Sequence, residues 1–194
     1  MNKIIVDVDG VCLNWFGPFL VYAGMTKDEW FAYEKSNPFR ARDLVHHFNE
    51  SIYMRNLPSY SDDCIFGMRT LFEHGNYIKL LSACLPGTIL DSMVIDARHD
   101  NLEKFFKHHT GVTYYRSTQF IGVGECKKHS LDKLANDGYS ILIEDHLRHA
   151  LSGVEVGLTT FLLDRSYNQF KGQEGEDEII RVKNWKEILE QIGY

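Results

Sequence analysis

The sequence predicts an α/β protein with a doubly wound parallel sheet and a small helical insertion after the first strand. Three observations lead to this fold class: short apolar runs recur along the chain, helix-like stretches separate them, and an aromatic-rich region without strand pattern follows the first run. Short apolar runs are typical of strands buried on both faces of a parallel sheet. Strands that alternate with helices favour a sheet covered by helices.

The predicted strands are distributed over the whole chain. Clear apolar runs occur at residues 4–8, 77–81, 141–143 and 158–163, and a weaker one at 112–115. Apolar side chains recur at helical spacing in residues 90–109, 128–136 and 185–192. The stretch 13–60 is rich in aromatic residues and contains no convincing strand. We therefore expect a core formed by residues 1–12 and 76–194 and a helical cap formed by residues 13–75.

Composition and charge narrow the class of protein. Of the 194 residues, 44% are hydrophobic and 25% are charged, as in ordinary globular proteins. The formal net charge of -6 leaves no large basic surface, so extended nucleic acid is not an expected partner. Aspartates interrupt the first apolar run, so we expect neither a signal peptide nor a membrane span there. The four cysteines have no C-x-x-C spacing, which indicates free thiols in a cytoplasmic protein.

Two aspartates stand at the end of the first predicted strand. Asp7 and Asp9 are two residues apart, so their side chains leave on the same side and can converge on one ion or substrate. Ligands of open parallel sheets bind beyond the carboxyl ends of the strands, where both residues fall. Gly10 lets the backbone turn sharply and bring its amides close to an anion. An EF-hand loop is excluded, because it requires an oxygen ligand at Val11 and glycine at Cys12.

Further polar residues follow other predicted strands or begin a helix. The hydroxyl of Ser82, after the strand at 77–81, can bind a phosphoryl oxygen, although Ser82 alone is equally typical of a loop start. Lys127 and Lys128 precede a predicted helix, where one ammonium can neutralise phosphate. Glu144 and Asp145 follow a buried strand and can complete an oxygen site for a hard cation.

These residues together resemble the four motifs of the haloacid dehalogenase (HAD) superfamily of phosphatases. The matching segments are DVDG at 7–10, Ser82, the lysine pair, and IED at 143–145. The resemblance spans nearly the whole chain and implies a three-layer, Rossmann-like parallel sheet core with a helical cap inserted after the first strand. It also implies a Mg²⁺-dependent phosphomonoesterase that works through an aspartyl phosphate.

The resemblance implies four roles in the reaction, the last of which falls on one of two lysines. Asp7 is the expected nucleophile, Asp9 the general acid and base, and Ser82 the hydroxyl that binds phosphate. Lys128 is preferred over Lys127 as the catalytic lysine, although the spacing to Leu131 does not decide between them.

The same resemblance implies the ligands of the metal. The Mg²⁺ site is expected among Asp7, Asp9, Glu144 and Asp145. Asp145 is the side chain expected to bind Mg²⁺ directly. Glu144 is expected to act mainly by contacting the residues that bind Mg²⁺, without binding the ion itself.

A closer similarity is to the 5'(3')-deoxyribonucleotidases. It rests on DVDGVCLNW at 7–15, on the Ser82 segment with Pro86 shortly after, and on VKNWKEIL at 182–189. In that family an aromatic residue six positions after the second aspartate stacks on the base, and Trp15 stands there. Glu144 departs from the usual aspartate, and Ala83 from the usual polar residue beside the phosphate. The similarity implies a nucleoside monophosphate as substrate, with Gly10, Trp15 and Ala83 as binding residues.

The sequence leaves some other functions possible and excludes others. The open alternatives are a HAD phosphatase for another small phosphate ester, a catalytically silent binding module and an enzyme acting on nucleic-acid ends. A second copy of the chain, in a homodimer, is a possible partner. No cysteine is followed six positions later by arginine, which excludes a cysteine phosphatase, and GVGECKK at 122–128 matches no phosphate-binding loop motif. His146 and His149 lack two further zinc ligands, so a surface or capping role is expected for them.

Overall fold

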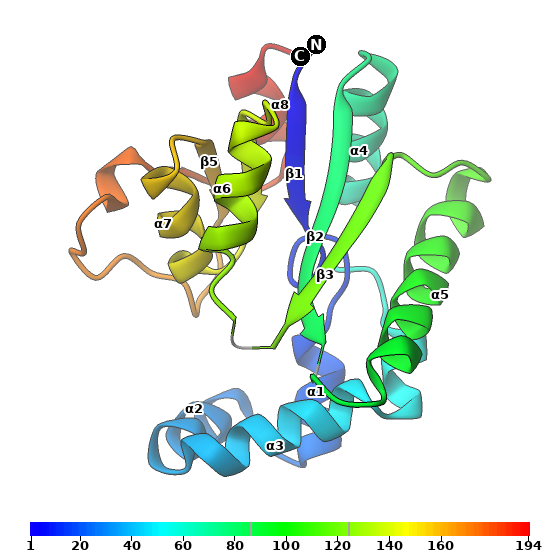
Figure 1. The fold of residues 1–194 in the computed structure, drawn as a ribbon, viewed down its shortest axis with the longest axis vertical. Coiled ribbons are helices and arrows are strands. Elements are labelled where there is room, and N and C mark those ends of the chain that lie inside the picture. Colours follow the sequence, from blue (N-terminus) through cyan, green and yellow to red (C-terminus); the bar gives the residue numbers. More distant parts are fainter. Residues whose placement is uncertain (86, 124) are drawn as a thin grey trace.

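A parallel sheet of six strands forms the centre of the protein. The computed structural model describes residues 1–85, 87–123 and 125–194, so Pro86, which is part of the nucleotidase similarity, and Gly124 lie outside the described residues. The strands are β1 (Lys3–Asp7), β2 (Tyr77–Leu85), β3 (Ser117–Gly122), β4 (Ile141–Glu144), β5 (Thr159–Leu163) and β6 (Ile180–Val182). They pair in parallel in the order β3-β2-β1-β4-β5-β6 (Figure 1). The predicted α/β fold class is confirmed.

The strand order places the switch point of the sheet between β1 and β4. From β1 the chain builds outward through β2 and β3, and it then returns to build β4, β5 and β6 on the other side. The register pairs Val6 with Ile143, so the residues that follow these two leave adjacent strands side by side. Ligands of doubly wound sheets bind at such a switch point, beyond the carboxyl ends of the strands.

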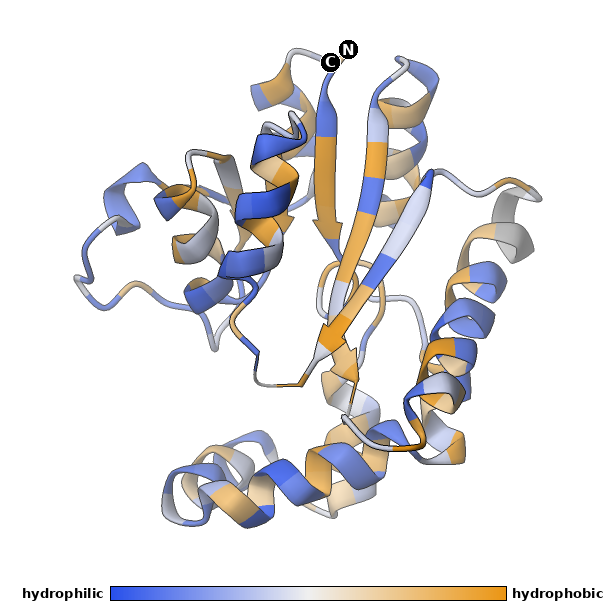
Figure 2. Cartoon of the chain, viewed as in Figure 1, coloured by the Kyte–Doolittle hydropathy of each residue, from blue (hydrophilic) through white to orange (hydrophobic). Residues whose placement is uncertain are grey.

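Helices cover both faces of the sheet. The helices are α1 (Phe16–Ala23), α2 (Lys27–Ser36), α3 (Pro38–Asn49), α4 (Asp62–Glu73), α5 (Asp91–Thr110), α6 (Lys128–Asn136), α7 (Leu147–Glu155) and α8 (Trp185–Ile192), with short 3-10 turns at Ile52–Asn56 and Glu176–Glu178. Alternate residues of β1 face opposite layers: Ile4 and Val6 pack in the core that includes α4, α5 and α8, whereas Ile5 packs with α6. Figure 2 shows β1 as an almost continuous apolar strand between these layers.

The expected edges of the sheet differ from the observed ones. The weak strand expected at 112–115 lies instead at Ser117–Gly122, and β6 was not expected. Only Ile121 of β3 is fully buried, because β3 is an edge strand with one neighbour. Edge strands bury fewer residues, and the apolar pattern that identifies a strand is correspondingly weak there.

The helical insertion projects beyond the carboxyl ends of the strands and comprises α1, α2 and α3 (Figure 1). Its entry and exit are tied together, because the amide of Asn14 donates to the carbonyl of Pro58 (2.9 Å) and that of Tyr60 to the carbonyl of Cys12 (2.9 Å). The insertion is held by its own aromatic core, in which Phe19 packs on Trp15 and Trp30 with ring centroids 4.7 and 4.5 Å apart.

The cap ends earlier than the expected boundary at residue 75. Helix α4 packs against α8 beside the sheet and belongs to the core. The two helices approach so closely at Gly67 that an added Cβ would overlap the ring of Trp185. No helix in the described part of the chain is long and apolar enough to cross a bilayer.

Candidate active site

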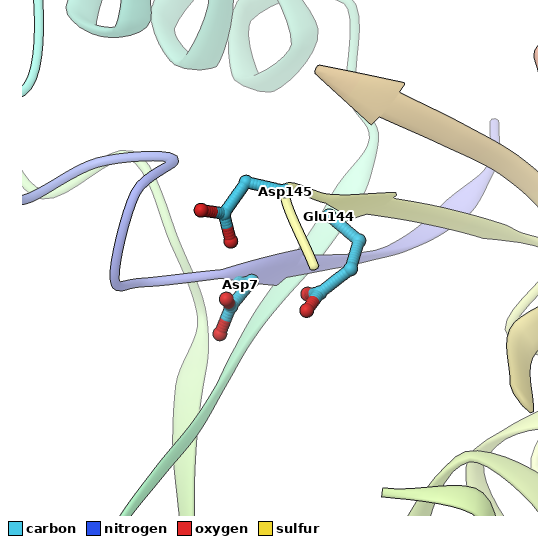
Figure 3. Close-up of side chains that lie close together, drawn as sticks. All are labelled: Asp7, Glu144 and Asp145. Atoms are coloured by element: carbon cyan, nitrogen blue, oxygen red, sulfur yellow. The ribbon is translucent and has the colours of Figure 1, made fainter. Parts of the chain in front are cut away.

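Three carboxylates meet where β1 and β4 end. Asp7 is the last residue of β1, Glu144 is the last of β4, and Asp145 follows it. One carboxylate oxygen from each lies within 4.8 Å of the others (Figure 3). All three residues are buried, with exposed fractions of 6% or less. Such a cluster of hard oxygen donors is suited to a divalent cation such as Mg²⁺.

Lys127 is the lysine of this site. Its Nζ lies 2.6 Å from Oδ1 of Asp7 and 3.1 Å from Oε2 of Glu144, and its side chain is 1% exposed. Lys128 points away, is 54% exposed and pairs with Glu155 at the surface. The structure therefore corrects the preference for Lys128, because residue 127 faces the sheet and residue 128 faces solvent.

Asp9 lies beside the carboxylate cluster but is not part of it. Its Oδ2 is 2.6 Å from Nη2 of Arg98 and accepts a hydrogen bond from Oγ of Ser82 at 3.2 Å. The expected convergence of Asp7 and Asp9 on one ion is therefore not seen, because Arg98 draws the Asp9 carboxylate to α5. Burial raises the pKa of Asp9, and the positive charge of Arg98 opposes that rise.

Glu144 is held by His149 and Lys127. Its Oε1 accepts a hydrogen bond from Nδ1 of His149 at 2.9 Å, and its Oε2 faces Lys127. Burial and the neighbouring Lys127 charge lower the pKa of His149 to about 3, so a neutral imidazole carries the donated proton on Nδ1. The expected surface or capping role for His149 is wrong. Its ring is half-buried and supports the site, whereas His146 is exposed at the site's rim.

The loop after β5 braces both halves of the site. The Tyr167 hydroxyl donates to Oδ2 of Asp145, and Nδ2 of Asn168 donates to the Asp145 carbonyl (2.6 Å) and to the Leu163 carbonyl (2.7 Å). Nη2 of Arg165 donates to the carbonyl of Gly10 at 2.9 Å. Gly10 has φ +77°, and an added Cβ there would overlap the Asp145 carboxylate. Glycine is thus required by both conformation and space.

A pocket of about 290 Å³ opens between this cluster and the cap. Its floor carries Asp7, Asp9, Gly10, Ala83, Lys127, Asp145 and Tyr167, and its cap side carries Trp15, Phe16, Trp30, Phe31 and Glu34. Trp15 also holds the cap together, since its Nε1 donates to Oδ1 of Asn49 at 2.8 Å and its ring stacks on Phe19. The pocket therefore joins an acidic, lysine-bearing floor to an aromatic wall.

The chain matches no protein-family model and no curated protein. Among solved structures, a putative HAD-hydrolase from Bacillus subtilis bound to magnesium has a TM-score of 0.63 at 10% identity, covering 100% of this chain and 99% of that chain. A predicted phosphatase from Clostridium acetobutylicum has a TM-score of 0.60 at 13% identity, covering 98% and 97%. An L-2-haloacid dehalogenase has a TM-score of 0.61 at 13% identity, covering 100% of both chains. The chain has the HAD-like fold.

The charge balance of this HAD-like site fits a bound cation. Burial, followed by repulsion from Glu144, raises the pKa of Asp7 to about 6, although Lys127 opposes the rise. Burial and the charges of Glu144 and Asp7 also raise the pKa of Asp145. Burial acts to lower the pKa of Lys127, but Asp7 and Glu144 outweigh it and raise that pKa. One ammonium thus faces three buried carboxylates, and Asp7 and Asp145 are the two that line the pocket and would hold the ion.

Three residues of the site were not expected from the sequence: Arg98, His149 and Tyr167. Arg98 stands four residues after Val94 and four before Leu102, so it lies on the apolar stripe of the helix predicted at 90–109. A cation at such a position signals a buried partner. Tyr167 follows a predicted strand end, which is the place where ligand-binding residues gather in this type of sheet.

Proposed function

We propose that this protein is a Mg²⁺-dependent phosphomonoesterase in which Asp7 forms a covalent aspartyl phosphate. One observation carries the proposal: the buried Asp7 carboxylate faces the pocket, with Lys127 at 2.6 Å and two further carboxylates beside it. A carboxylate attacks a phosphate dianion only when the charge between them is offset. Lys127 supplies part of that offset, and Mg²⁺ held by Asp7 and Asp145 would supply the rest when bound.

The chain's own residues divide the reaction between them. Asp7 attacks phosphorus through a carboxylate oxygen, while Asp9 protonates the leaving oxygen and then takes a proton from the water that hydrolyses the aspartyl phosphate. Ser82 and Ala83 lie in the carboxyl-terminal half of β2. The Ser82 hydroxyl donates to Asp9 and becomes available to a phosphoryl oxygen if that bond is exchanged. The cap wall limits the access of bulk water.

Dehalogenation is the competing chemistry, because a dehalogenase shares the fold. A halide leaves as a stable anion and needs neither a proton donor nor a divalent cation. Asp9 would then have no proton to transfer, and three buried carboxylates would repel the departing anion. The arrangement of Asp9, Asp145 and Lys127 supports phosphoryl transfer.

We further propose that the substrate is a nucleoside monophosphate, as the similarity to the 5'(3')-deoxyribonucleotidases implies. The aromatic wall of the pocket supports a flat leaving group, since base–aromatic stacking contributes about 1–3 kcal/mol. The net charge of -6 disfavours an enzyme that acts on nucleic-acid ends, because it leaves no large basic surface for a polynucleotide. The four cysteines of the chain are free thiols, which is consistent with the proposed cytoplasmic location.

The proposal is tested by phosphate release from nucleoside monophosphates, sugar phosphates and an aryl phosphate, with Mg²⁺ and with a chelator. Release that requires Mg²⁺ and favours nucleotides is expected. Release from sugars or the aryl ester alone would retain the mechanism and reject the nucleotide substrate. Silence with every ester would favour a binding module, and halide release from a haloacid would favour a dehalogenase.

Trp15→Ala is expected to raise KM for a nucleoside monophosphate about tenfold and to spare a small alkyl phosphate. The reason is loss of the stacking surface on the cap wall. Trp15→Phe is the control, because it keeps a stacking ring and loses only the bond to Asn49. Equal losses with both substrates would mean that Trp15 only holds the cap together.

Tyr167→Phe is expected to weaken Mg²⁺ binding about tenfold, measured by titration calorimetry. Its hydroxyl orients the Asp145 carboxylate, and such supporting hydrogen bonds contribute about 10–100-fold to metal affinity. Tyr139→Phe is the matched control, since Tyr139 packs on Tyr77 away from the site. Equal Mg²⁺ affinity in the two variants would contradict this role of Tyr167.

A further inference from the structure

Arg98 is a buried cation that the proposed mechanism does not use. It lies on α5 with an exposed fraction of 0%, and its Nη2 is 2.6 Å from Oδ2 of Asp9. Removing a guanidinium from water is costly, so a buried arginine needs a partner that offsets its charge. Asp9 is that partner. Arg98 does not line the pocket, so it is not placed to bind the phosphate itself.

The two oxygens of Asp9 have different surroundings. Oδ2 is bound by Arg98 and by the Ser82 hydroxyl. Oδ1 is buried and has no hydrogen-bond partner among the residues that the structure describes. An orphaned buried oxygen is unfavourable, which points to a partner that arrives with the substrate. Asp9 lines the pocket beside Asp7, where such a partner would lie.

We propose that Arg98 is a positioning residue: it holds Oδ2 of Asp9 and thereby presents Oδ1 as the oxygen that exchanges protons during the reaction. This inference rests on the proposed phosphatase function. In the first half-reaction the bond from Asp7 to phosphorus forms, the ester P–O bond breaks, and the proton of Oδ1 passes to the leaving oxygen. In the second, a water oxygen binds phosphorus, its proton passes to Oδ1, and the bond from Asp7 to phosphorus breaks.

The consequence is a dependence on the leaving group. An alkoxide leaves poorly without a proton, whereas a nitrophenolate is stable enough to leave unprotonated. If Arg98 aims the proton donor, its loss harms alkyl phosphates selectively. A merely structural role would reduce the activity toward both esters by the same factor. The ratio of the two kcat/KM values is also independent of the fraction of the sample that is folded.

The experiment measures kcat/KM for an alkyl phosphate and for nitrophenyl phosphate in the parent chain, Arg98→Met, Arg98→Lys and Asp9→Asn. We use kcat/KM because it reports the step in which the leaving group departs. Arg98→Met is expected to lower the alkyl-to-aryl ratio about 100-fold, the size of a general-acid contribution. Asp9→Asn gives the alkyl-to-aryl ratio of an enzyme that has lost its proton donor entirely. Arg98→Lys, which keeps a shorter cation, is expected to give an intermediate ratio.

The control variant is Arg55→Met, which breaks the ion pair of Arg55 with Asp100 on the exposed side of α5 (2.7 Å). Its ratio is expected to equal that of the parent. An unchanged ratio in the Arg98 variants of an active enzyme would overturn the inference and leave the phosphatase intact. If Arg98→Met yields no folded protein, the ratio of Arg98→Lys decides alone. A parent chain inactive on both esters would overturn the phosphatase and this inference together.

Discussion

Asp7→Asn is expected to abolish phosphate release, by at least about 10⁴-fold, and to leave the protein folded. An amide cannot form the acyl phosphate, and the remaining site has no second carboxylate in the same position. Asp7 also lines the pocket, pairs with Lys127 and belongs to the carboxylate cluster. A rapid acid quench with a phosphate ester should trap hydroxylamine-sensitive phosphate on the parent chain and none on the variant.

The same substitution is expected not to destabilise the metal-free protein at neutral pH. The pKa of Asp7 is raised from 3.8 to about 6 in the folded state, chiefly by burial. A carboxyl with a raised pKa contributes stability below its unfolded pKa, and that contribution is lost as the pH rises through its folded pKa. The free energy of unfolding of the parent, measured with a chelator, should therefore fall relative to Asp7→Asn between about pH 4 and pH 6.

The matched control for both measurements is Asp43→Asn, which changes an exposed carboxylate on α3 of the cap. It should keep the activity and the pH dependence of the parent. Residual turnover in Asp7→Asn that still requires Mg²⁺ would refute Asp7 as the nucleophile. Strong destabilisation of Asp7→Asn would mean that the ion pair between Asp7 and Lys127 stabilises the folded protein by more than the burial of the Asp7 charge destabilises it.

The sequence predicts the centre of this fold better than its edges. Strands β1, β2, β4 and β5 each have several buried residues in succession, and apolar runs identify them. Strand β6 has only three residues, and β3 has one buried residue, so neither leaves a clear pattern. The cap boundary is less predictable still, because it depends on the packing of Gly67 against Trp185, two residues far apart in the chain.

The site is predictable where it follows strand ends and unpredictable where side chains reach it from elsewhere. Asp7, Glu144 and Asp145 meet because β1 and β4 are neighbours in the sheet. Arg98 and Tyr167 arrive from a helix and a loop whose placement depends on the whole fold. The choice between the two lysines could not be predicted, because residues 127 and 128 both lie within one helical turn of buried Leu131. Only the structure separates them: Lys127 pairs with Asp7 and Glu144, and Lys128 is exposed.

Lys127→Met is expected to lower kcat/KM about 10³-fold and to destabilise the metal-free protein by about 3–5 kcal/mol. Nζ of Lys127 lies close to both Asp7 and Glu144. Among the described residues no other lysine or arginine pairs with the three buried carboxylates, so removing Lys127 leaves their negative charge without a side-chain cation. The pKa of Lys127 is raised, so its contribution to stability is fully present at neutral pH and is lost only in strong alkali. Mg²⁺ is expected to restore part of the lost melting temperature.

The adjacent Lys128→Met is the control, because Lys128 is exposed and pairs with Glu155 at the surface, away from the carboxylate cluster. It should leave activity and melting temperature unchanged. The double variant Lys127→Met/Glu144→Gln separates folding from catalysis. Removing one carboxylate charge should recover much of the stability, while activity stays low because no ammonium remains to offset charge between Asp7 and the phosphate. Recovery of activity together with stability would mean that Lys127 acts only by holding the buried carboxylates in place.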